Sequence, residues 1–366
     1  MDDNGTELGI VNGENGYIWD ATSGFRLISD TDFHAANTIT FMDSFFLFDR
    51  AGTGQIFRSD QLDGTSYDGT AFTTAESQSD DLLALKNHKQ VLYALGKKSI
   101  ELYGNAGAAN MPFQRIPGAT INRGLAGSYG LTDEDESLFM LGNDRIAYRG
   151  NGRALQRIST HGLEATWQNY GTVADIVAFS YTWNGHKFIC LTFPQIASTW
   201  CYDIASQLWH ERVSHDRTGN SLGRWRANCA AAAYEKTYIG DAFTGKIGYL
   251  SNTTYTEFGD DTIAEIVSPP LHANGNRAFM PWFELDIETG VGLTSGQGSN
   301  PQVMLSVSDN GGRSFDNPEV WSSMGMTGEY DGTAYQLRWD RLGSFYTRNV
   351  RVTISDPVRR AVYGAR

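Results

Sequence analysis

The stretch Val91-Leu92-Tyr93-Ala94-Leu95-Gly96-Lys97-Lys98-Ser99-Ile100-Glu101-Leu102-Tyr103 decides the fold. Two apolar runs, residues 91–95 and 99–103, flank a polar segment that begins with Gly96. Apolar runs rich in aromatic and β-branched residues on both sides of a glycine-containing turn are typical of a β-hairpin. The stretch therefore predicts two antiparallel strands joined by a tight turn.

The first of these strands recurs along the chain at a nearly constant step. Its anchor residues are Phe46, Leu92, Phe139, Phe188 and Thr237, which are separated by steps of 46, 47, 49 and 49 residues. A second strand follows each of the last four anchors, at residues 99–103, 145–148, 199–203 and 246–249, and residues 8–13 with 17–20 repeat the hairpin once more. Four strands every ~45–50 residues is the period of a β-propeller blade, and stacked blades bury faces that one blade alone leaves exposed.

The sequence therefore predicts an all-β fold, a β-propeller of about five or six blades over residues 1–268. The alternative is an array of β-sandwiches whose spacing is coincidental. Helical periodicity is scarce, and the best short helix covers residues 159–167, with Ser159 or Thr160 as its N-cap.

A second domain is predicted after Ser268-Pro269-Pro270, because two adjacent prolines cannot both join a central β-ladder. Residues 279–289 alternate between apolar and polar side chains, and residues 303–307 and 350–354 read as further strands. Residues 279–366 are thus expected to form a small antiparallel, β-sandwich-like domain.

The charge and the apolar content of the chain exclude some classes of protein. The 366 residues carry a net charge of −13, and an acidic surface repels phosphate, so the chain is not a general DNA-binding protein. Seven arginines fall in the last 29 positions and are expected to be exposed on strands: Arg338, Arg341, Arg348, Arg351, Arg359, Arg360 and Arg366. Residues 1–20 lack a basic start and an apolar core, and no apolar run reaches the ~18 residues that span a bilayer, so neither a signal peptide nor a membrane segment is expected.

Catalytic and metal-binding patterns are absent from the sequence. The three cysteines, Cys190, Cys201 and Cys229, include no C-x-x-C pair, and the seven histidines include no H-E-x-x-H. His210 and His215 are interpreted as a surface pair in a loop, and residues 133–136 (DEDE) as a solvated acidic turn, with a calcium or partner site as the alternative. With no nucleophile elbow and no phosphate-binding loop, we expect no enzymatic activity, no cofactor and no metal.

Two motifs stand out near the C-terminus. Ser308-Asp309-Asn310-Gly311-Gly312-Arg313-Ser314-Phe315 resembles the Asp-box turn of sialidases, with Asn310 where the pattern has Asp. Its expected structure is a hairpin turn in which a side chain accepts backbone N–H groups, glycine adopts positive φ and Phe315 packs underneath. The second motif is W-x-R-x-G, formed by Trp339, Arg341 and Gly343; we expect Trp339 to pack under the hairpin of residues 303–315 and Gly343 to occupy a turn.

The motifs near the C-terminus, taken together in their order along the chain, resemble those of a known protein family. Trp339, Arg341 and Gly343, an arginine-rich strand and Ser355-Asp356-Pro357-Val358 resemble the C-terminal domain of podoviral packaged-DNA stabilisation proteins, the tail hub or nozzle proteins of short-tailed phages. Residues 100–103 and the turn Arg123-Gly124-Leu125-Ala126-Gly127 are similar to further motifs of that family, which has lysine at the position of Arg123. The resemblance runs from about Leu8 to the end, and because family members carry more sequence ahead of it, blade count and ring closure stay open.

The resemblance implies a structural protein of the virion tail, made and assembled in the host cytoplasm. It implies a homo-oligomeric ring, a hexamer in the family, that contacts tail adaptor or portal-side proteins and tail needle, fibre or tailspike proteins, and through which genomic DNA passes. Two alternatives remain: a receptor- or glycan-binding propeller that uses Trp183 and Trp225 on sugar, and a sialidase-like hydrolase. The hydrolase would need an inward carboxylate pair or an arginine cluster.

Overall fold

The computed structural model describes residues 1–366 except 76–79, 217, 317–319, 327 and 329–336. The chain divides into two compact units, which are described separately: Met1–Arg212 with Arg224–Ile247, and Val213–Gly223 with Gly248–Arg366. Within the described residues, no helix combines the length and the apolar character that crossing a membrane requires.

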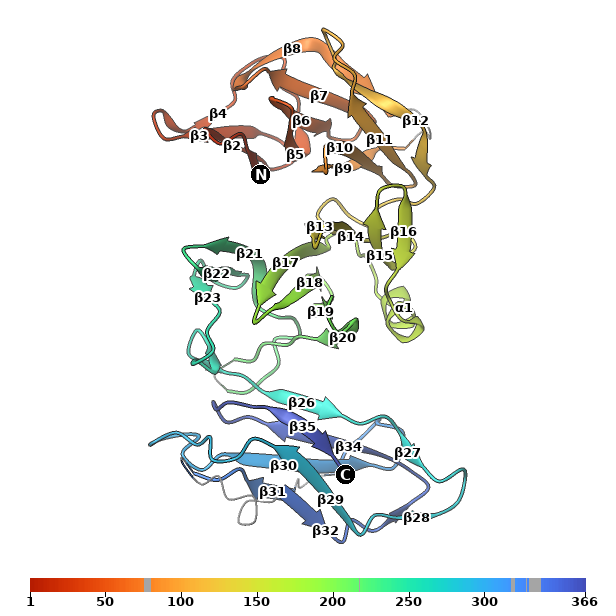
Figure 1. The fold of residues 1–366 in the computed structure, drawn as a ribbon, viewed down its shortest axis with the longest axis vertical. Coiled ribbons are helices and arrows are strands. Elements are labelled where there is room, and N and C mark those ends of the chain that lie inside the picture. Colours follow the sequence, from red (N-terminus) through yellow and green to blue (C-terminus); the bar gives the residue numbers. More distant parts are fainter. Residues whose placement is uncertain (76–79, 217, 317–319, 327, 329–336) are drawn as a thin grey trace. The chain divides into compact units, whose positions relative to one another are not determined.

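In its described residues the first unit contains six consecutive antiparallel sheets, the last strand of which continues past Ile247 into the second unit (Figure 1). The first three sheets are β1 (Asp2–Asp3), β2 (Glu7–Val11), β3 (Gly16–Asp20) and β4 (Gly24–Leu27); β5 (Ala36–Met42), β6 (Phe45–Arg50), β7 (Gln55–Asp60) and β8 (Asp63–Thr74); and β9 (Leu82–His88), β10 (Val91–Gly96), β11 (Ile100–Asn105) and β12 (Phe113–Ile121). The next three are β13 (Leu131–Glu134), β14 (Ser137–Leu141), β15 (Ala147–Asn151) and β16 (Ala154–Arg157); β17 (Val177–Trp183), β18 (His186–Phe193), β19 (Ser198–Asp203) and β20 (Leu208–Glu211); and β21 (Ala227–Ala233), β22 (Lys236–Asp241) and β23 (Ile247–Tyr249).

The repeat predicted from the sequence is confirmed. The anchors Phe46, Leu92, Phe139, Phe188 and Thr237 lie in β6, β10, β14, β18 and β22, which are the second strands of five different sheets. Strand β10 is buried along almost its whole length, because it lies inside its own sheet and that sheet packs on its neighbours. Strands β6 and β14 are buried in the same way, which explains why the anchors Phe46, Leu92 and Phe139 lie in continuous apolar runs instead of an alternating pattern.

Neighbouring sheets are joined by side-chain to backbone hydrogen bonds between their first strands. Thr38 Oγ1 accepts the Leu85 N–H at 2.8 Å, and Thr40 Oγ1 accepts the Asn87 N–H at 3.1 Å, so β5 and β9 are bonded across the sheet boundary. The residues on either side of these bonds are 47 apart in sequence, one blade period.

Helix α1 (His161–Gln168) begins at Thr160, whose hydroxyl accepts the Leu163 N–H, as the sequence predicts. The strand predicted at 145–148 begins later, at Ala147, because Arg145 adopts a positive φ of 60° in the preceding turn. From there its guanidinium donates to four carbonyl oxygens at and just after the end of α1, those of Trp167, Gln168, Tyr170 and Gly171. Arg145 therefore adds a cationic donor to the carbonyl groups at and just beyond the C-terminal end of α1.

The second unit contains a hairpin and a two-layer sandwich. Its strands are β24 (Thr256–Glu257), β25 (Asp260–Asp261), β26 (Ala264–Val267), β27 (Leu271–His272), β28 (Ala278–Phe279), β29 (Trp282–Ile287), β30 (Gln302–Ser308), β31 (Val320–Ser323), β32 (Leu337–Asp340), β33 (Ser344–Phe345), β34 (Thr347–Ile354) and β35 (Val362–Ala365). One layer has the order β26-β34-β30-β31, with β27 also paired to β34, and the other has the order β32-β29-β35.

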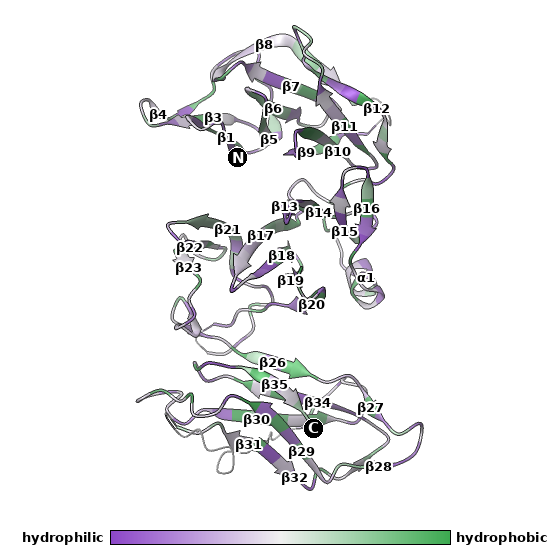
Figure 2. Cartoon of the chain, viewed as in Figure 1, coloured by the Kyte–Doolittle hydropathy of each residue, from purple (hydrophilic) through white to green (hydrophobic). Residues whose placement is uncertain are grey.

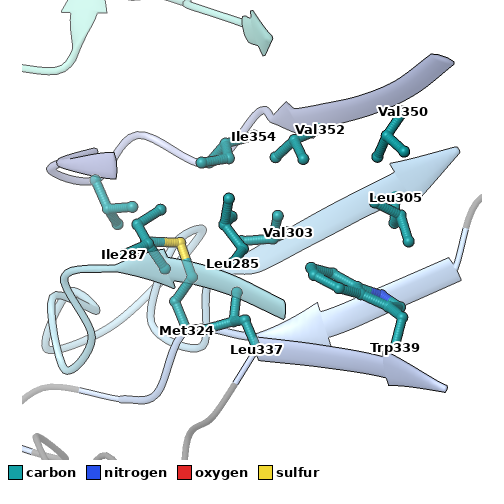
Figure 3. Close-up of a cluster of buried hydrophobic side chains, with 11 residues drawn as sticks. Leu285, Ile287, Val303, Leu305, Met324, Leu337, Trp339, Val350, Val352 and Ile354 are labelled. Carbon is teal, nitrogen blue, oxygen red and sulfur yellow. The ribbon is translucent and has the colours of Figure 1, made fainter. Parts of the chain in front are cut away.

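The core between these layers is built from alternate residues of the facing strands (Figure 3). Leu285 and Ile287 come from one layer, and Val303, Leu305 and Val352 from the other. Such alternation is what a strand buried on one face requires.

The first unit does not end where the prolines indicate. Strand β26, which precedes Ser268, pairs with β34 from Ala264↔Ile354 to Val267↔Arg351, so residues 264–267 belong to the sandwich. The second unit also includes Val213–Gly223, a segment that lies between two parts of the first unit in the sequence. The residues on either side of this segment both bind Thr199. Arg212 N–H donates to the Thr199 carbonyl at 2.9 Å, and Trp225 N–H donates to its hydroxyl at 3.2 Å.

Candidate functional site

The Asp-box-like turn follows β30 and is held by two side chains. Ser308 is buried, and its hydroxyl donates to Asn310 Oδ1 at 2.8 Å while accepting the Gly312 N–H at 3.0 Å. Asn310 Oδ1 also accepts the N–H groups of Arg313 and Ser314, and Gly311 and Gly312 have φ of 76° and 80°. Asn310 thus fills the role of the usual Asp, and its amide adds a bond to the Ser314 hydroxyl at 2.6 Å that a carboxylate could not donate.

Asp309 points the other way, into an ion pair with Arg348 of β34. Arg348 Nε and Nη2 each donate to one Asp309 carboxylate oxygen at 2.7 Å, and Arg348 Nη1 donates to the Leu342 carbonyl at 2.5 Å. The guanidinium also lies 4.6 Å from the centre of the Phe345 ring. The expectation that all seven late arginines are exposed is therefore wrong for Arg348, whose side chain is 4% exposed.

Phe315, the aromatic residue of the motif, is half-buried and lies under a second arginine. The Arg351 guanidinium is 4.3 Å from the Phe315 ring centre, and Arg351 Nε donates to the Ser306 hydroxyl at 2.9 Å. Both arginines of β34 therefore hold the Asp-box turn against the sheet.

Trp339, Arg341 and Gly343 lie at the end of β32. Trp339 is 4% exposed in the cluster that contains Val303 and Leu305, and its ring centre is 6.0 Å from that of Phe283 (Figure 3). Gly343 has φ of 77°, and Arg341, with φ of 64°, is an exposed residue whose N–H donates to the Pro281 carbonyl at 2.7 Å. Trp339 therefore packs in the core and Gly343 lies in a turn, and a structural role for the signature as a whole stays a prediction.

The family-like turn of residues 123–127 lies directly against the backbone of Lys97 and of Ala174. A Cβ atom on Gly124 would lie 2.0 Å from the Lys97 carbonyl oxygen, and one on Gly127 would lie 2.2 Å from that of Ala174. The Leu125 N–H donates to the Gly96 carbonyl at 2.9 Å. Glycine is needed here because backbone passes directly over backbone.

The acidic turn of residues 133–136 is more than a solvated loop, because every carboxylate has a cationic partner. Lys86 pairs with Asp133 at 2.6 Å and Lys89 with Glu136 at 3.3 Å, both from the third sheet. Arg149 of the fourth sheet and Lys187 of the fifth pair with Asp135 at 2.9 and 3.2 Å, and Lys187 also reaches Glu134 at 3.3 Å. The hydrogen bond from Lys187 is the main cause that lowers the pKa of Asp135.

Asp49 is a buried acid that the sequence patterns did not single out. Its side chain is inaccessible to solvent and accepts the Thr38 N–H at 2.6 Å, the Thr38 hydroxyl at 2.7 Å and the Asn37 amide at 2.8 Å. Burial raises the pKa of Asp49 to about 6, and the three hydrogen bonds oppose that shift. An aspartate next to the apolar run of residues 45–48 is a signal in the sequence that could have drawn attention to Asp49. Its burial could not have been predicted from neighbouring residues, because its hydrogen-bond partners lie eleven and twelve positions away.

Two interpretations of aromatic and histidine residues need correction. Trp225 is 5% exposed, and the Arg212 guanidinium lies 4.6 Å from its ring, so it is not a free surface for sugar; Trp183 is half-buried. His210 lies in β20 and not in a loop. Burial is the larger cause that lowers the pKa of His210 to about 4, and the positive charge of Arg212 is the second cause. His215 belongs to the second unit.

An apolar cavity of about 230 Å³ opens in the sandwich between β26 and β35, both of which carry apolar side chains (Figure 2). It is lined by Ile266, Ser268, Phe283, Leu285, Val350, Val352, Val362, Gly364 and Ala365. None of these residues supplies a titratable group for acid–base chemistry. In the part of the chain that the structure describes, no cluster of His, Cys, Asp and Glu is arranged to hold a metal ion.

Six consecutive small antiparallel sheets followed by a two-layer sandwich define a β-propeller protein with an appended β-sandwich domain. The family described as "Bacteriophage P22 Gp10, beta-propeller" matches residues 1–255, and "Bacteriophage P22 Gp10, beta-sandwich" matches residues 264–366. The chain therefore belongs to the bacteriophage P22 Gp10 family, the packaged-DNA stabilisation proteins, which are structural proteins of the phage tail.

Some solved structures align with this chain at low sequence identity and low TM-score. An exo-β-1,3-galactanase from Phanerochaete chrysosporium is 11% identical, covers 97% of this chain and 100% of its own, and has a TM-score of 0.33. The extracellular domain of the putative one-component system BT4673 from B. thetaiotaomicron is 11% identical over 87% of this chain and 39% of its own, with a TM-score of 0.44. At these scores the likenesses support no functional conclusion. No curated protein sequence gives a significant match.

Proposed function

We propose that this protein is a non-enzymatic tail hub, or nozzle, of a short-tailed bacteriophage, which assembles as a ring, continues the DNA channel and retains the packaged genome. The observation that carries the proposal is the match of both domains, in order, to the P22 Gp10 family. The ring is a hexamer docked on portal-side adaptor proteins and on the needle, fibre or tailspike proteins of the tail, located in the virion after assembly in the host cytoplasm.

The charge of the chain supports retention by a mechanical barrier. Phosphate gripping depends on Lys and Arg displacing counterions, whereas this chain has 42 acidic and 29 basic residues. An acidic conduit repels the duplex and lets it slide. Closure of the channel must then come from the assembled tail rather than from affinity for DNA.

The buried charged groups support a structural role over a sialidase-like one. Arg226 pairs with Asp241 at 3.1 Å, Arg224 donates to Asn228 at 2.9 Å, and Arg212 packs on the rings of Trp225, Phe188 and Tyr181. These arginines serve internal packing, and Asp49, the buried acid, is engaged by three donors. A hydrolase needs such groups turned towards substrate.

The test is genome retention in particles assembled without this protein. They should package DNA and then lose it, and supplying the chain in trans should restore full particles. Isolated protein should bind duplex DNA no tighter than the roughly 10⁻⁴–10⁻⁶ M of non-specific binding at physiological salt.

Two results would overturn the proposal. Particles that keep their genome and fail only at host attachment would assign the receptor-binding function instead. Turnover of a polysaccharide or sialoside that a single carboxylate substitution abolishes would assign the hydrolase function.

A further inference from the structure

The fifth sheet holds two of the three cysteines in directly opposed positions. Cys190 of β18 pairs with Cys201 of β19 in the antiparallel register, and both side chains are inaccessible to solvent. Opposite residues of an antiparallel ladder have Cα atoms about 4.5 or 5.5 Å apart, and disulfides span Cα distances of roughly 4.4–6.8 Å. The backbone therefore holds this pair at a separation that a disulfide can bridge.

Side chains on this face of the sheet meet across the two strands. Thr192 and Thr199 form another opposed pair two residues along the ladder, so they share a face with the cysteines. Their hydroxyl groups are hydrogen-bonded at 3.1 Å. The thiols of Cys190 and Cys201 are likewise hydrogen-bonded to each other. The two sulfur atoms therefore approach each other, as formation of a bond between them requires.

We infer that Cys190 and Cys201 are an oxidation site, a dithiol in a reducing environment that becomes a cross-strand disulfide in an oxidising one. The oxidant is a small disulfide such as oxidised glutathione. One cysteine thiolate attacks a glutathione sulfur and releases a first glutathione thiol, and the second cysteine then displaces the other glutathione as the bond between the two cysteine sulfurs forms. The cysteines lose two hydrogens, which the two glutathione thiols gain. The bridge ties β18 to β19, the two central strands of the sheet.

The surroundings of the pair make Cys201 the attacking thiol. Burial raises the pKa of Cys190, and its hydrogen bond with Cys201 raises that pKa further. Burial also opposes ionisation of Cys201, but the hydrogen bond from Cys190 and the positive charge of Arg212 outweigh it and lower the pKa of Cys201. Arg212 Nε donates at 3.1 Å to Nε2 of His210, the residue opposite Cys201 in the ladder with β20. Because the thiolate is the reactive form of cysteine, Cys201 attacks and Cys190 completes the bridge.

Access of the oxidant to Cys201 depends on β20, which is the last strand in the order of this sheet. It has only four residues, from Leu208 to Glu211, and Leu208 is 67% exposed. A short strand at the edge of a sheet opens at a lower free energy than the fold as a whole. Such opening uncovers Cys201 while β18 and β19 stay paired. The inference rests on this register and these contacts, independently of the tail-hub proposal.

The test uses the full chain with Cys229 replaced, because Cys229 is exposed and would itself react with the oxidant. The folded Cys229→Ala protein is incubated with oxidised glutathione, its remaining thiols are alkylated in urea, and its peptides are analysed by mass spectrometry. Cys190→Ser and Cys201→Ser in the same background are the matched controls, since each of them leaves a single thiol.

The Cys229→Ala protein should lose two hydrogens and yield a peptide in which Cys190 is joined to Cys201, while circular dichroism shows that the protein stays folded. Dithiothreitol should restore both thiols, and neither single-thiol variant should lose two hydrogens. Thiols that stay free in the folded protein and form the bridge only after unfolding in urea would overturn the inference. A bridge that forms only with loss of the folded spectrum, or a mixed disulfide with glutathione as the final product, would overturn it as well.

Discussion

Asp309 and Arg348, 39 residues apart, form a two-bond ion pair that joins the Asp-box turn to β34. The pair is asymmetric, because the Arg348 side chain is 4% exposed and that of Asp309 is 47% exposed. The carboxylate therefore serves mainly to neutralise a guanidinium that the fold has buried.

Asp309→Asn should destabilise the sandwich by about 1–3 kcal/mol, because Arg348 would keep its burial and lose its counter-charge. Thermal unfolding of the full chain measures the change. The matched control is Asp340→Asn, which removes the partner of Arg338 in a pair at 2.9 Å whose side chains are 40% and 58% exposed. That substitution should cost less than about 1 kcal/mol. Equal effects would show that burial of Arg348 does not matter.

Trp339→Ala should lower the free energy of unfolding by ~3–5 kcal/mol, as truncation of a buried tryptophan does. The same substitution at Trp321, which is 62% exposed on β31, is the control and should change stability little. Denaturant titration followed by circular dichroism gives both values. A Trp339→Ala protein with unchanged stability that failed to assemble would instead make Trp339 a contact residue.

Gly127→Ala should destabilise the propeller by about 1–3 kcal/mol, since the new methyl group would press on the Ala174 carbonyl. Gly162, in the first turn of α1, has no atom within 4 Å of its Cβ direction. Gly162→Ala should therefore stabilise the protein by roughly 0.5–1 kcal/mol through helix propensity. If Gly127→Ala lowers the free energy of unfolding and Gly162→Ala raises it, the close contact with the Ala174 backbone is what requires glycine at position 127. Thermal or denaturant unfolding of both variants measures this difference.

Asp49 should make the propeller less stable as pH rises from 4 to 7. Its folded pKa of about 6 lies above the ordinary value of 3.8, so the folded state binds the proton more tightly than the unfolded state. The contribution to stability is then fully present below about pH 4 and is lost as pH rises through 6. The loss is on the order of 3 kcal/mol. Asp49→Asn should remove this component, and a difference between variant and parent that is the same at pH 4 and pH 7 would contradict the assignment.

The repeat could be predicted from the sequence because burial of the second strand in each sheet leaves a local signal. Phe46, Leu92 and Phe139 sit in continuous apolar runs, and those runs mark the sheets one by one. The turns of the C-terminal motifs could also be predicted from local sequence, because Gly311, Gly312 and Gly343 adopt positive φ, which glycine favours.

What could not be predicted depends on residues far apart in the chain. The burial of Trp225 requires Phe179 and Tyr181, and that of Arg348 requires Asp309. Similarly, Ala264–Val267 joins the sandwich because β34, some 90 residues later, provides its ladder. Local patterns carry no information about such partners.

The chain passes between the two units at three places: after Arg212, after Gly223 and after Ile247. Within the second unit, the Ser214 hydroxyl of the segment between the first two places donates to Glu257 at 2.5 Å. Arg212 and Trp225, which flank this segment in the first unit, both donate backbone N–H groups to Thr199. A tensile force that pulls the units apart is therefore divided among three covalent segments instead of one. A single cut by a protease within residues 213–223 would leave the units covalently tethered.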